Sequence, residues 1–238
     1  MRLHRFHIPD PVGTKTELTL HSAGLVNQIH RVFRLKKGDS VIVFDGSGSD
    51  YTCRIEDLGK TSITLAVIEA SKSRFMPSQE LILCAAIVKK DTFEWITEKA
   101  TELGVTTIIP VIAERSEKKA LNEERLKKIA IEASEQSGRG NVPRIEQVVS
   151  LREVVDSMVK EEGKRKMTAF HTEGEAFGSE DILNNESVAV FIGPEGGWSP
   201  DELDLFHRNE IPIRCLGQQI LRAETAVVAA LSQIVFTR

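Results

Sequence analysis

The chain has 238 residues, of which 41% are hydrophobic and 28% are charged, so its composition is that of a folded globular protein and excludes wholesale disorder. The net charge of −4 does not mark a nucleic-acid-binding protein, but the charge is unevenly distributed. Residues 1–72 hold 10 Lys and Arg against 8 Asp and Glu, whereas the remainder holds 21 against 27. A slightly basic N-terminal part could contact RNA, although a solvated surface explains the difference equally well.

The three cysteines, Cys53, Cys84 and Cys215, lie far apart and form no CxxC or CxxH pair. This spacing argues against a disulfide framework and against a structural metal site, and it favours a reducing compartment. The longest unbroken apolar run, residues 81–88, is too short to cross a bilayer, and the N-terminus lacks the apolar segment of a secretion signal. We therefore expect a cytoplasmic protein that neither enters a membrane nor binds a metal.

The first 70 or so residues have the pattern of short strands joined by turns. A β-rich run at 41–44, a turn cluster at 45–50 and a second run at 51–55 together indicate a hairpin, and 63–68 is a further strand. Several short strands in so short a segment predict a small barrel or sandwich. The polar, proline-containing stretch at 71–78 is typical of a linker.

After the linker, predicted strands and helices alternate, which indicates an α/β domain with a mostly parallel sheet. The expected strands are 81–88, 106–111, 167–171, 187–192 and 211–216. The expected helices begin after Asp91 and Asn122 and cover 151–159, 200–207 and 224–236. In such sheets ligands bind at the carboxyl ends of the strands, so the loops there are the candidate sites.

The loop after the strand at 187–192 is rich in glycine and leads into a well-specified helix start. Ser199 suits the N-cap, Pro200 the first helical position and Glu202 the third. A tight connection would explain the glycines by itself. Because Glu195 lies within this acidic loop, a nucleoside or a cationic ligand suits the loop better than a polyphosphate.

The loop after the strand at 211–216 also precedes a helix and carries two apolar residues, Ile220 and Leu221. They either line a pocket for a flat ring or pack under the last helix. The broad apolar face of that helix is core, subunit interface or both. A third strand end carries His171, although a lone histidine there is more often a hydrogen-bonded surface residue than a catalyst.

Two further stretches carry an arginine in a polar turn. Arg115 lies between Glu114 and Ser116, and Arg139 is flanked by glycines at the end of a predicted helix. An arginine in such a turn can contact a phosphate or a base edge, and a simple solvated surface is the alternative.

These motifs together resemble the bacterial 16S ribosomal RNA uracil-N3 methyltransferases, which belong to the SPOUT (trefoil-knot) methyltransferases. The resemblance spans nearly the whole chain in the family's order. It rests on Gly193-Pro194-Glu195-Gly196-Gly197, on Leu216-Gly217 with Ile220-Leu221-Arg222 and Glu224-Thr225-Ala226, on Thr101-Glu102-Leu103-Gly104, on Glu114-Arg115-Ser116, on Glu135-Gln136-Ser137-Gly138-Arg139, and on 30–35 with Gly38-Asp39. One departure is Gln219, where the family usually has a basic residue.

The resemblance implies a PUA-like, RNA-binding β-barrel over residues 1–72. It implies a SPOUT methyltransferase domain over 73–238 whose last part forms a trefoil knot around the cofactor. It further implies a homodimer that binds S-adenosyl-L-methionine and methylates N3 of a uridine in 16S ribosomal RNA, within the small ribosomal subunit. A non-catalytic RNA-binding or ribosome-assembly protein with a vestigial knot is the alternative, and an enzyme acting on a small molecule with a nucleotide is a third possibility.

The residues carried over from the resemblance form three sets. The candidate catalytic residues are Arg115, Arg139, Glu195, Arg222 and Glu224. The candidate cofactor-binding residues are Phe170, His171, Ile192, Gly193, Glu195, Gly196, Gly197, Leu216, Gly217, Ile220, Leu221 and Arg222. The candidate RNA-binding residues are Arg2, Arg5, Arg31, Arg34, Gln136 and Arg139. All of this requires that the loops at 193–197 and 216–222 fold side by side into one cleft.

Overall fold

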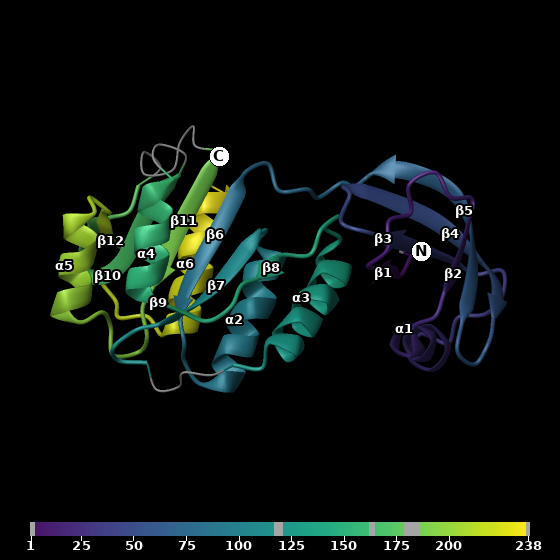
Figure 1. The fold of residues 1–238 in the computed structure, drawn as a ribbon, viewed down its shortest axis with the longest axis horizontal. Coiled ribbons are helices and arrows are strands. Elements are labelled where there is room, and N and C mark those ends of the chain that lie inside the picture. Colours follow the sequence, from purple (N-terminus) through teal and green to yellow (C-terminus); the bar gives the residue numbers. More distant parts are fainter. Residues whose placement is uncertain (1–2, 117–120, 162–164, 179–185, 237–238) are drawn as a thin grey trace. The chain divides into compact units, whose positions relative to one another are not determined.

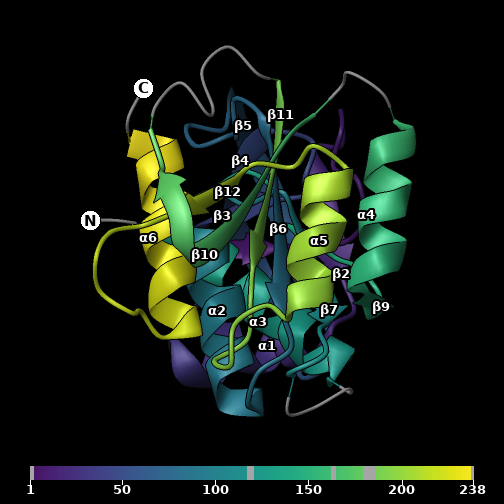
Figure 2. The same ribbon diagram turned by 90° about the vertical axis from the view of Figure 1, so that its left-hand side faces the viewer.

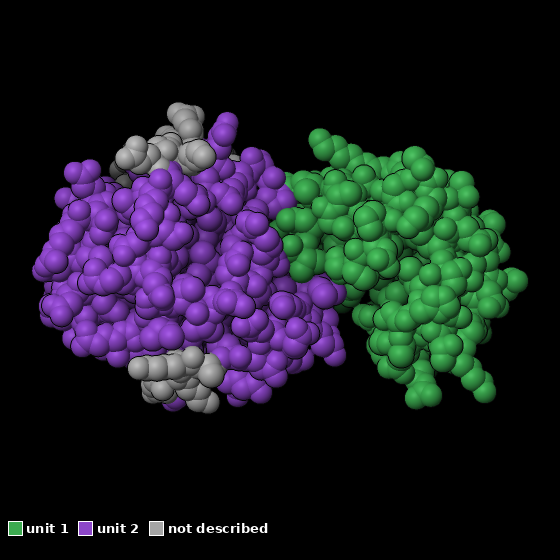
Figure 3. Space-filling model, in the orientation of Figure 1, with its two compact units in different colours: residues 1–76, 134–142 green, residues 77–133, 143–238 purple. Residues whose placement is uncertain are grey.

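A computed structural model describes residues 3–116, 121–161, 165–178 and 186–236 of the chain. It divides into two compact units, one formed by residues 1–76 with 134–142 and the other by 77–133 with 143–238 (Figure 3). The segment 134–142 therefore belongs with the N-terminal part, whereas the sequence suggested one boundary between residues 72 and 73. None of the described helices combines the length and the apolarity that a membrane span requires.

The first unit is a curled five-stranded sheet around a single apolar core (Figure 1). Its strands follow the order β1-β3-β4-β5-β2; β1 pairs with β3 in parallel, and the other pairs are antiparallel. Register shifts in the long β4–β5 pair are the irregularities that let a sheet bend. The elements are β1 (Arg5–His7), β2 (Glu17–Leu20), α1 (Ala23–Asn27), the π-helix η1 (Gln28–Val32), β3 (Ser40–Phe44), β4 (Ser49–Leu58) and β5 (Ile63–Lys72).

The second unit is a parallel sheet covered on both faces by helices. Its described strands follow the order β12-β10-β11-β6-β7-β8, and β9 also pairs with β7. Helices α2 and α6 lie on one side of the sheet, and α4 and α5 lie on the other (Figure 2). The elements are β6 (Glu80–Ala86), α2 (Lys90–Glu102), β7 (Thr107–Ile112), α3 (Glu123–Ser137), β8 (Arg144–Ile145), β9 (Val149–Ser150), α4 (Leu151–Lys160), β10 (Lys166–Ala176), β11 (Ser187–Ile192), α5 (Pro200–Arg208), β12 (Ile213–Cys215) and α6 (Ala223–Phe236).

Burial on both faces explains why the central strands could be recognised from sequence. Every residue of β11 is buried, and so is all of β6 after its first residue. Strands covered on both faces have continuous apolar runs instead of alternation. One helix start differs from the expectation: α2 begins at Lys90 with Lys89 at the N-cap, so Asp91 lies in the first turn, where its charge favours the helix dipole.

Candidate functional site

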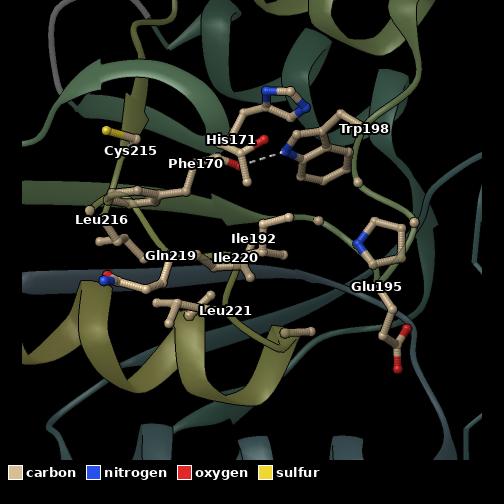
Figure 4. Close-up of a pocket in the computed structure, with 18 residues that line it drawn as sticks. Phe170, His171, Ile192, Glu195, Trp198, Cys215, Leu216, Gln219, Ile220 and Leu221 are labelled. Atoms are coloured by element: carbon tan, nitrogen blue, oxygen red, sulfur yellow. Dashed lines mark hydrogen bonds between the residues drawn. The ribbon is translucent and has the colours of Figure 1, made fainter.

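A cavity of about 270 Å³ opens beside the middle of β10 and at the ends of β11 and β12 (Figure 4). His171 lies within β10, which continues to Ala176, and not at the strand end that the sequence indicated. Three stretches of chain line it: the strand residues 170–172, the loop 192–198, and residues of 215–226. The loops after β11 and β12 therefore lie side by side around one cavity, as the sequence analysis required. The lining residues are Phe170, His171, Thr172, Ile192, Gly193, Pro194, Glu195, Gly196, Gly197, Trp198, Cys215, Leu216, Gly217, Gln219, Ile220, Leu221, Ala223 and Ala226.

Trp198 fixes the loop after β11 to the body of the unit. Its indole is only 2% exposed and packs edge-on against Phe206 of α5, with ring centroids 5.3 Å apart. Its Nε1 donates a hydrogen bond to the Phe170 carbonyl oxygen at 3.1 Å (Figure 4). A Cβ at Gly193 would approach this indole to 3.2 Å, so glycine allows the tight passage of the chain beside the ring.

The same loop then turns sharply into α5. Gly197 has φ of +69°, a conformation that L side chains rarely adopt, and its N–H donates to the Pro194 carbonyl oxygen at 2.9 Å. Ser199 and Glu202 form a capping box at the start of α5, with Pro200 at the first helical position. The predicted start of this helix is confirmed. The hydrogen bond of Gly197 and the capping box fix the backbone of the loop where it enters α5.

Arg115, in the segment after β7, forms hydrogen bonds to the loop that follows β11. Its Nη1 donates to the carbonyl oxygens of Gly196 at 2.8 Å and of Trp198 at 3.4 Å. Glu202 joins the same two segments, because its Oε1 accepts from the Glu114 N–H at 2.9 Å and its Oε2 from the Ser199 N–H at 2.8 Å. The structure thus gives Arg115 contacts that position the glycine-rich loop, and Arg115 is not among the lining residues of the cavity.

The loop after β12 lines the cavity with apolar side chains. Leu216, Ile220 and Leu221 line the cavity together with Phe170 and Ile192 of the neighbouring strands (Figure 4). Ile220 is 86% exposed, although it is an aliphatic residue. An aliphatic side chain at the open mouth of an apolar cavity is suited to cover a flat ring bound inside it.

His171 points toward the glycine-rich loop. Its Nδ1 accepts a hydrogen bond from the Glu173 N–H at 3.2 Å. In the neutral imidazole this arrangement leaves the proton on Nε2. Nε2 lies 3.8 Å from the position that a Cβ on Gly197 would occupy, so the ring presents a donor to the side of the cavity where the loop turns.

Of the candidate catalytic residues, only Glu195 lines the cavity. Glu195 lines the cavity and is exposed, with its carboxylate directed away from the apolar wall (Figure 4). Arg222 is exposed, Glu224 lies in the first turn of α6, and neither is a lining residue. Arg139 belongs to the first unit.

Among the candidate cofactor-binding residues, all but Arg222 line the cavity. The cavity also includes residues that the sequence analysis did not assign to a site: Thr172, Pro194, Trp198, Cys215, Gln219, Ala223 and Ala226. No sequence pattern assigned Cys215 to the cavity, because its place depends on how the neighbouring strands meet.

Two of the candidate RNA-binding arginines leave little of their side chains at the surface: Arg139 is buried and Arg5 is half-buried. An RNA contact by either stays a prediction. Arg5 forms an ion pair with Asp50, donates to the Arg139 carbonyl oxygen and leaves 7% of its side chain exposed. Arg139 is 3% exposed and bonds to Asn141 Oδ1, and burial lowers the pKa of its guanidinium to about 10. Both arginines hold the first unit together instead of facing solvent.

The other candidates in the first unit are at the surface. Arg31, Arg34 and Gln136 are exposed. Arg2 lies outside the described residues.

The comparisons with known proteins agree with this geometry. An RNA methyltransferase domain family matches residues 76–235, and an RNA methyltransferase PUA domain family matches residues 29–68. The chain is 33% identical to Ribosomal RNA small subunit methyltransferase E of Rickettsia conorii, over 98% of this chain and 96% of that protein. It is also 33% identical to the protein of the same name from Bacillus subtilis, over 88% of this chain and 86% of the relative.

A solved structure has the same overall architecture. Ribosomal RNA small subunit methyltransferase E from Neisseria gonorrhoeae, bound to S-adenosyl methionine, superposes with a TM-score of 0.88 at 28% identity. The match covers 98% of this chain and 97% of that one.

Proposed function

The chain belongs to the RNA methyltransferase family of the small-subunit ribosomal RNA methyltransferases E, and we propose that it methylates N3 of a uridine in 16S ribosomal RNA with S-adenosyl-L-methionine. The observation that carries the proposal is the single cavity that the loops after β11 and β12 line together. The Neisseria relative was solved with S-adenosyl methionine bound, and its fold is similar over almost the entire chain.

The residues of the cavity fit such a nucleoside cofactor. Ile192, Leu216 and Leu221 offer an apolar wall for an adenine ring, and Gly193 and Gly197 let the ligand approach the backbone closely. The exposed carboxylate of Glu195 lies on the same loop, a charge that suits a cationic sulfonium better than a polyphosphate. When bound there, S-adenosylmethionine supplies a methyl group that is already activated for transfer.

The remaining chemistry falls to the chain's own side chains. The N3–H of uracil is a weak acid, so N3 becomes a good nucleophile only as its proton leaves. Of the two candidate bases, Glu195 is the better placed, since it lines the cavity and Glu224 does not. Arg115 keeps the loop that carries Glu195 in position through the Gly196 carbonyl oxygen. Developing negative charge on the uracil oxygens needs a cationic partner, for which Arg222, exposed in the loop after β12, remains a candidate.

N3 lies on the Watson–Crick edge, so the target base has to be unpaired or turned out of its stack. The first unit would hold the flanking RNA through exposed cations, of which Arg31, Arg34, Lys36 and Lys37 lie close together in sequence. We propose the small ribosomal subunit as the substrate and a homodimer as the active form. A ribosomal substrate assigns the enzyme to the cytoplasm.

Two measurements test the proposal in order. Isothermal titration with S-adenosylmethionine should give saturable binding that Gly197→Val strongly weakens, whereas absent binding by the wild type would refute the enzymatic function. Small ribosomal subunits that lack the modification are then incubated with methyl-labelled cofactor, and the label should appear on a uridine N3 of 16S RNA. Label on another atom or another RNA would disprove the proposed substrate, and sedimentation of the chain as a monomer would disprove the homodimer.

A further inference from the structure

We propose that the first unit contains a pocket that receives a second, unpaired base of the substrate RNA; this inference rests on the proposed function. The pocket is a cavity of about 230 Å³. Its walls are formed by Leu3, His4, Arg5, Phe33, Glu135 and Gln136, all of which belong to the first unit.

One wall of the pocket is aromatic. The rings of His4 and Phe33 lie with centroids 4.1 Å apart at 39°, and Phe6 supports Phe33 edge-on at 5.6 Å. Phe6 is completely buried, so the core supports Phe33, which also lines the cavity. Unpaired RNA bases are commonly bound by stacking on aromatic side chains held in this way.

The backbone around Phe33 is unusual at two successive points. The π-helix η1 ends at Val32 and is capped by Phe33, whose N–H donates to the Gln28 carbonyl oxygen at 2.9 Å. The next residue, Arg34, has φ of +56° although it is not a glycine. π-Helical turns and left-handed non-glycine residues are both uncommon, and both occur preferentially at functional sites. Here they place Phe33 in the cavity wall, with Arg31 and Arg34 exposed on either side of it in sequence.

The lining of the pocket also includes polar groups. Glu135 accepts hydrogen bonds from the His7 N–H at 2.9 Å and from Gln28 Nε2 at 3.3 Å, so it joins β1 to the π-helix. The carboxylate of Glu135 in the wall disfavours a phosphate inside the cavity, and the charge of Arg5, which also lines it, is already paired with Asp50. A neutral base can enter instead, with its edge toward the amide of Gln136, while the phosphates on either side meet Arg31 and Arg34. The charges therefore favour a base inside and the RNA backbone outside.

Binding of fluorescent RNA to the full chain, without cofactor, tests the pocket. The probes are single-stranded RNA octamers of each base and an RNA duplex of the same length, measured by fluorescence anisotropy. Phe33→Leu, which keeps apolar packing but removes the stacking surface, should weaken binding of the tightest single-stranded probe about tenfold. Arg31→Gln should weaken binding about threefold and reduce its salt dependence. The matched control Lys60→Gln, an exposed cation on the β4–β5 turn, should change binding less than twofold.

A second measurement locates the contact directly. Octamers containing 4-thiouridine are photocrosslinked to the wild-type chain, and mass spectrometry should place the crosslink on His4 or on residues 31–36. Thermal unfolding checks that Phe33→Leu is folded. Crosslinks that map elsewhere, undiminished RNA binding by folded Phe33→Leu, or a wild-type preference for the duplex would each overturn the pocket. Failure of the proposed function is seen separately, as absent S-adenosylmethionine binding or absent methyl transfer by the wild type.

Discussion

The two loops that line the cofactor cavity differ in how firmly the structure holds them. The loop after β11 is anchored by a buried indole, a capping box and hydrogen bonds from Arg115. The loop after β12 has no comparable anchor: within the described residues no hydrogen bond fixes 217–221, and Ile220 is 86% exposed. We infer that the loop after β11, which we call the first loop, is already formed before the ligand binds. The loop after β12, the second loop, becomes ordered when the ligand binds. A preformed half reduces the conformational entropy lost on binding, while the adjustable half lets the ligand enter.

The largest effect is expected at the anchor of the first loop. Trp198→Ala removes a nearly fully buried indole and should lower the free energy of unfolding by about 3–5 kcal/mol. Trp198→Phe retains most of the packing but loses the bond to the Phe170 carbonyl oxygen, and should cost less than half as much. Urea unfolding monitored by circular dichroism measures both variants. A loss below about 1 kcal/mol for the alanine variant would mean that the loop is not anchored through this ring.

The next effect concerns the backbone conformation of the first loop. Gly197→Val forces a β-branched side chain into a φ of +69°, beside His171, and should weaken S-adenosylmethionine binding at least about 50-fold. Gly13→Val is the matched control, because Gly13 has a similar φ of +57° and lies in the first unit. The control should lose stability without losing cofactor affinity, as measured by calorimetry. Equal loss of affinity in both variants would trace the effect to general destabilisation.

A smaller effect is expected for the support that the first loop receives from β7. Arg115→Gln removes the donor to the Gly196 and Trp198 carbonyl oxygens, so the loop becomes less well ordered before binding. Cofactor affinity should fall about fivefold, whereas the unfolding free energy should change by less than about 1 kcal/mol because the residue is exposed. Arg208→Gln, which breaks an exposed ion pair with Asp204, is the control and should leave the affinity unchanged. Unaltered affinity in Arg115→Gln would show that the loop keeps its shape without this support.

The sequence predicts the local conformation of the first loop better than it predicts the distant residues that bond to the loop. Glycines, a proline and a capping box are local signals, and Ser199 and Glu202 hold the helix start as expected. Arg115 contacts Gly196 across 81 positions of sequence, and no local pattern reveals such a partner. For the same reason, Arg5 was expected to face RNA. Its partner Asp50 lies 45 residues away, and only the folded sheet brings the two together.

The first unit was harder to predict for a related reason. β1 and β2 have 3 and 4 residues, too few to show a period. The π-helix has no sequence signature of its own. The segment 134–142 belongs to the first unit through contacts that are distant in sequence, such as the bond from His7 to Glu135. In the second unit, by contrast, β6 and β11 are buried along almost their whole length, so each appears in the sequence as a continuous apolar run.

The smallest effect on stability is expected for a variant of the second loop. This variant distinguishes most clearly between a preformed and an adjustable loop. Ile220→Ala shortens a side chain that is 86% exposed, so the unfolding free energy should change by no more than about 0.5 kcal/mol. If the open loop closes over the cofactor, the same side chain is buried only in the complex, and the affinity should fall about three- to tenfold. Ile68→Ala, at 56% exposed in the first unit, is the control and should alter neither quantity. A stability loss above about 1 kcal/mol in Ile220→Ala, without ligand, would mean that the second loop is already packed against something, and the contrast between a preformed and an adjustable half would not hold.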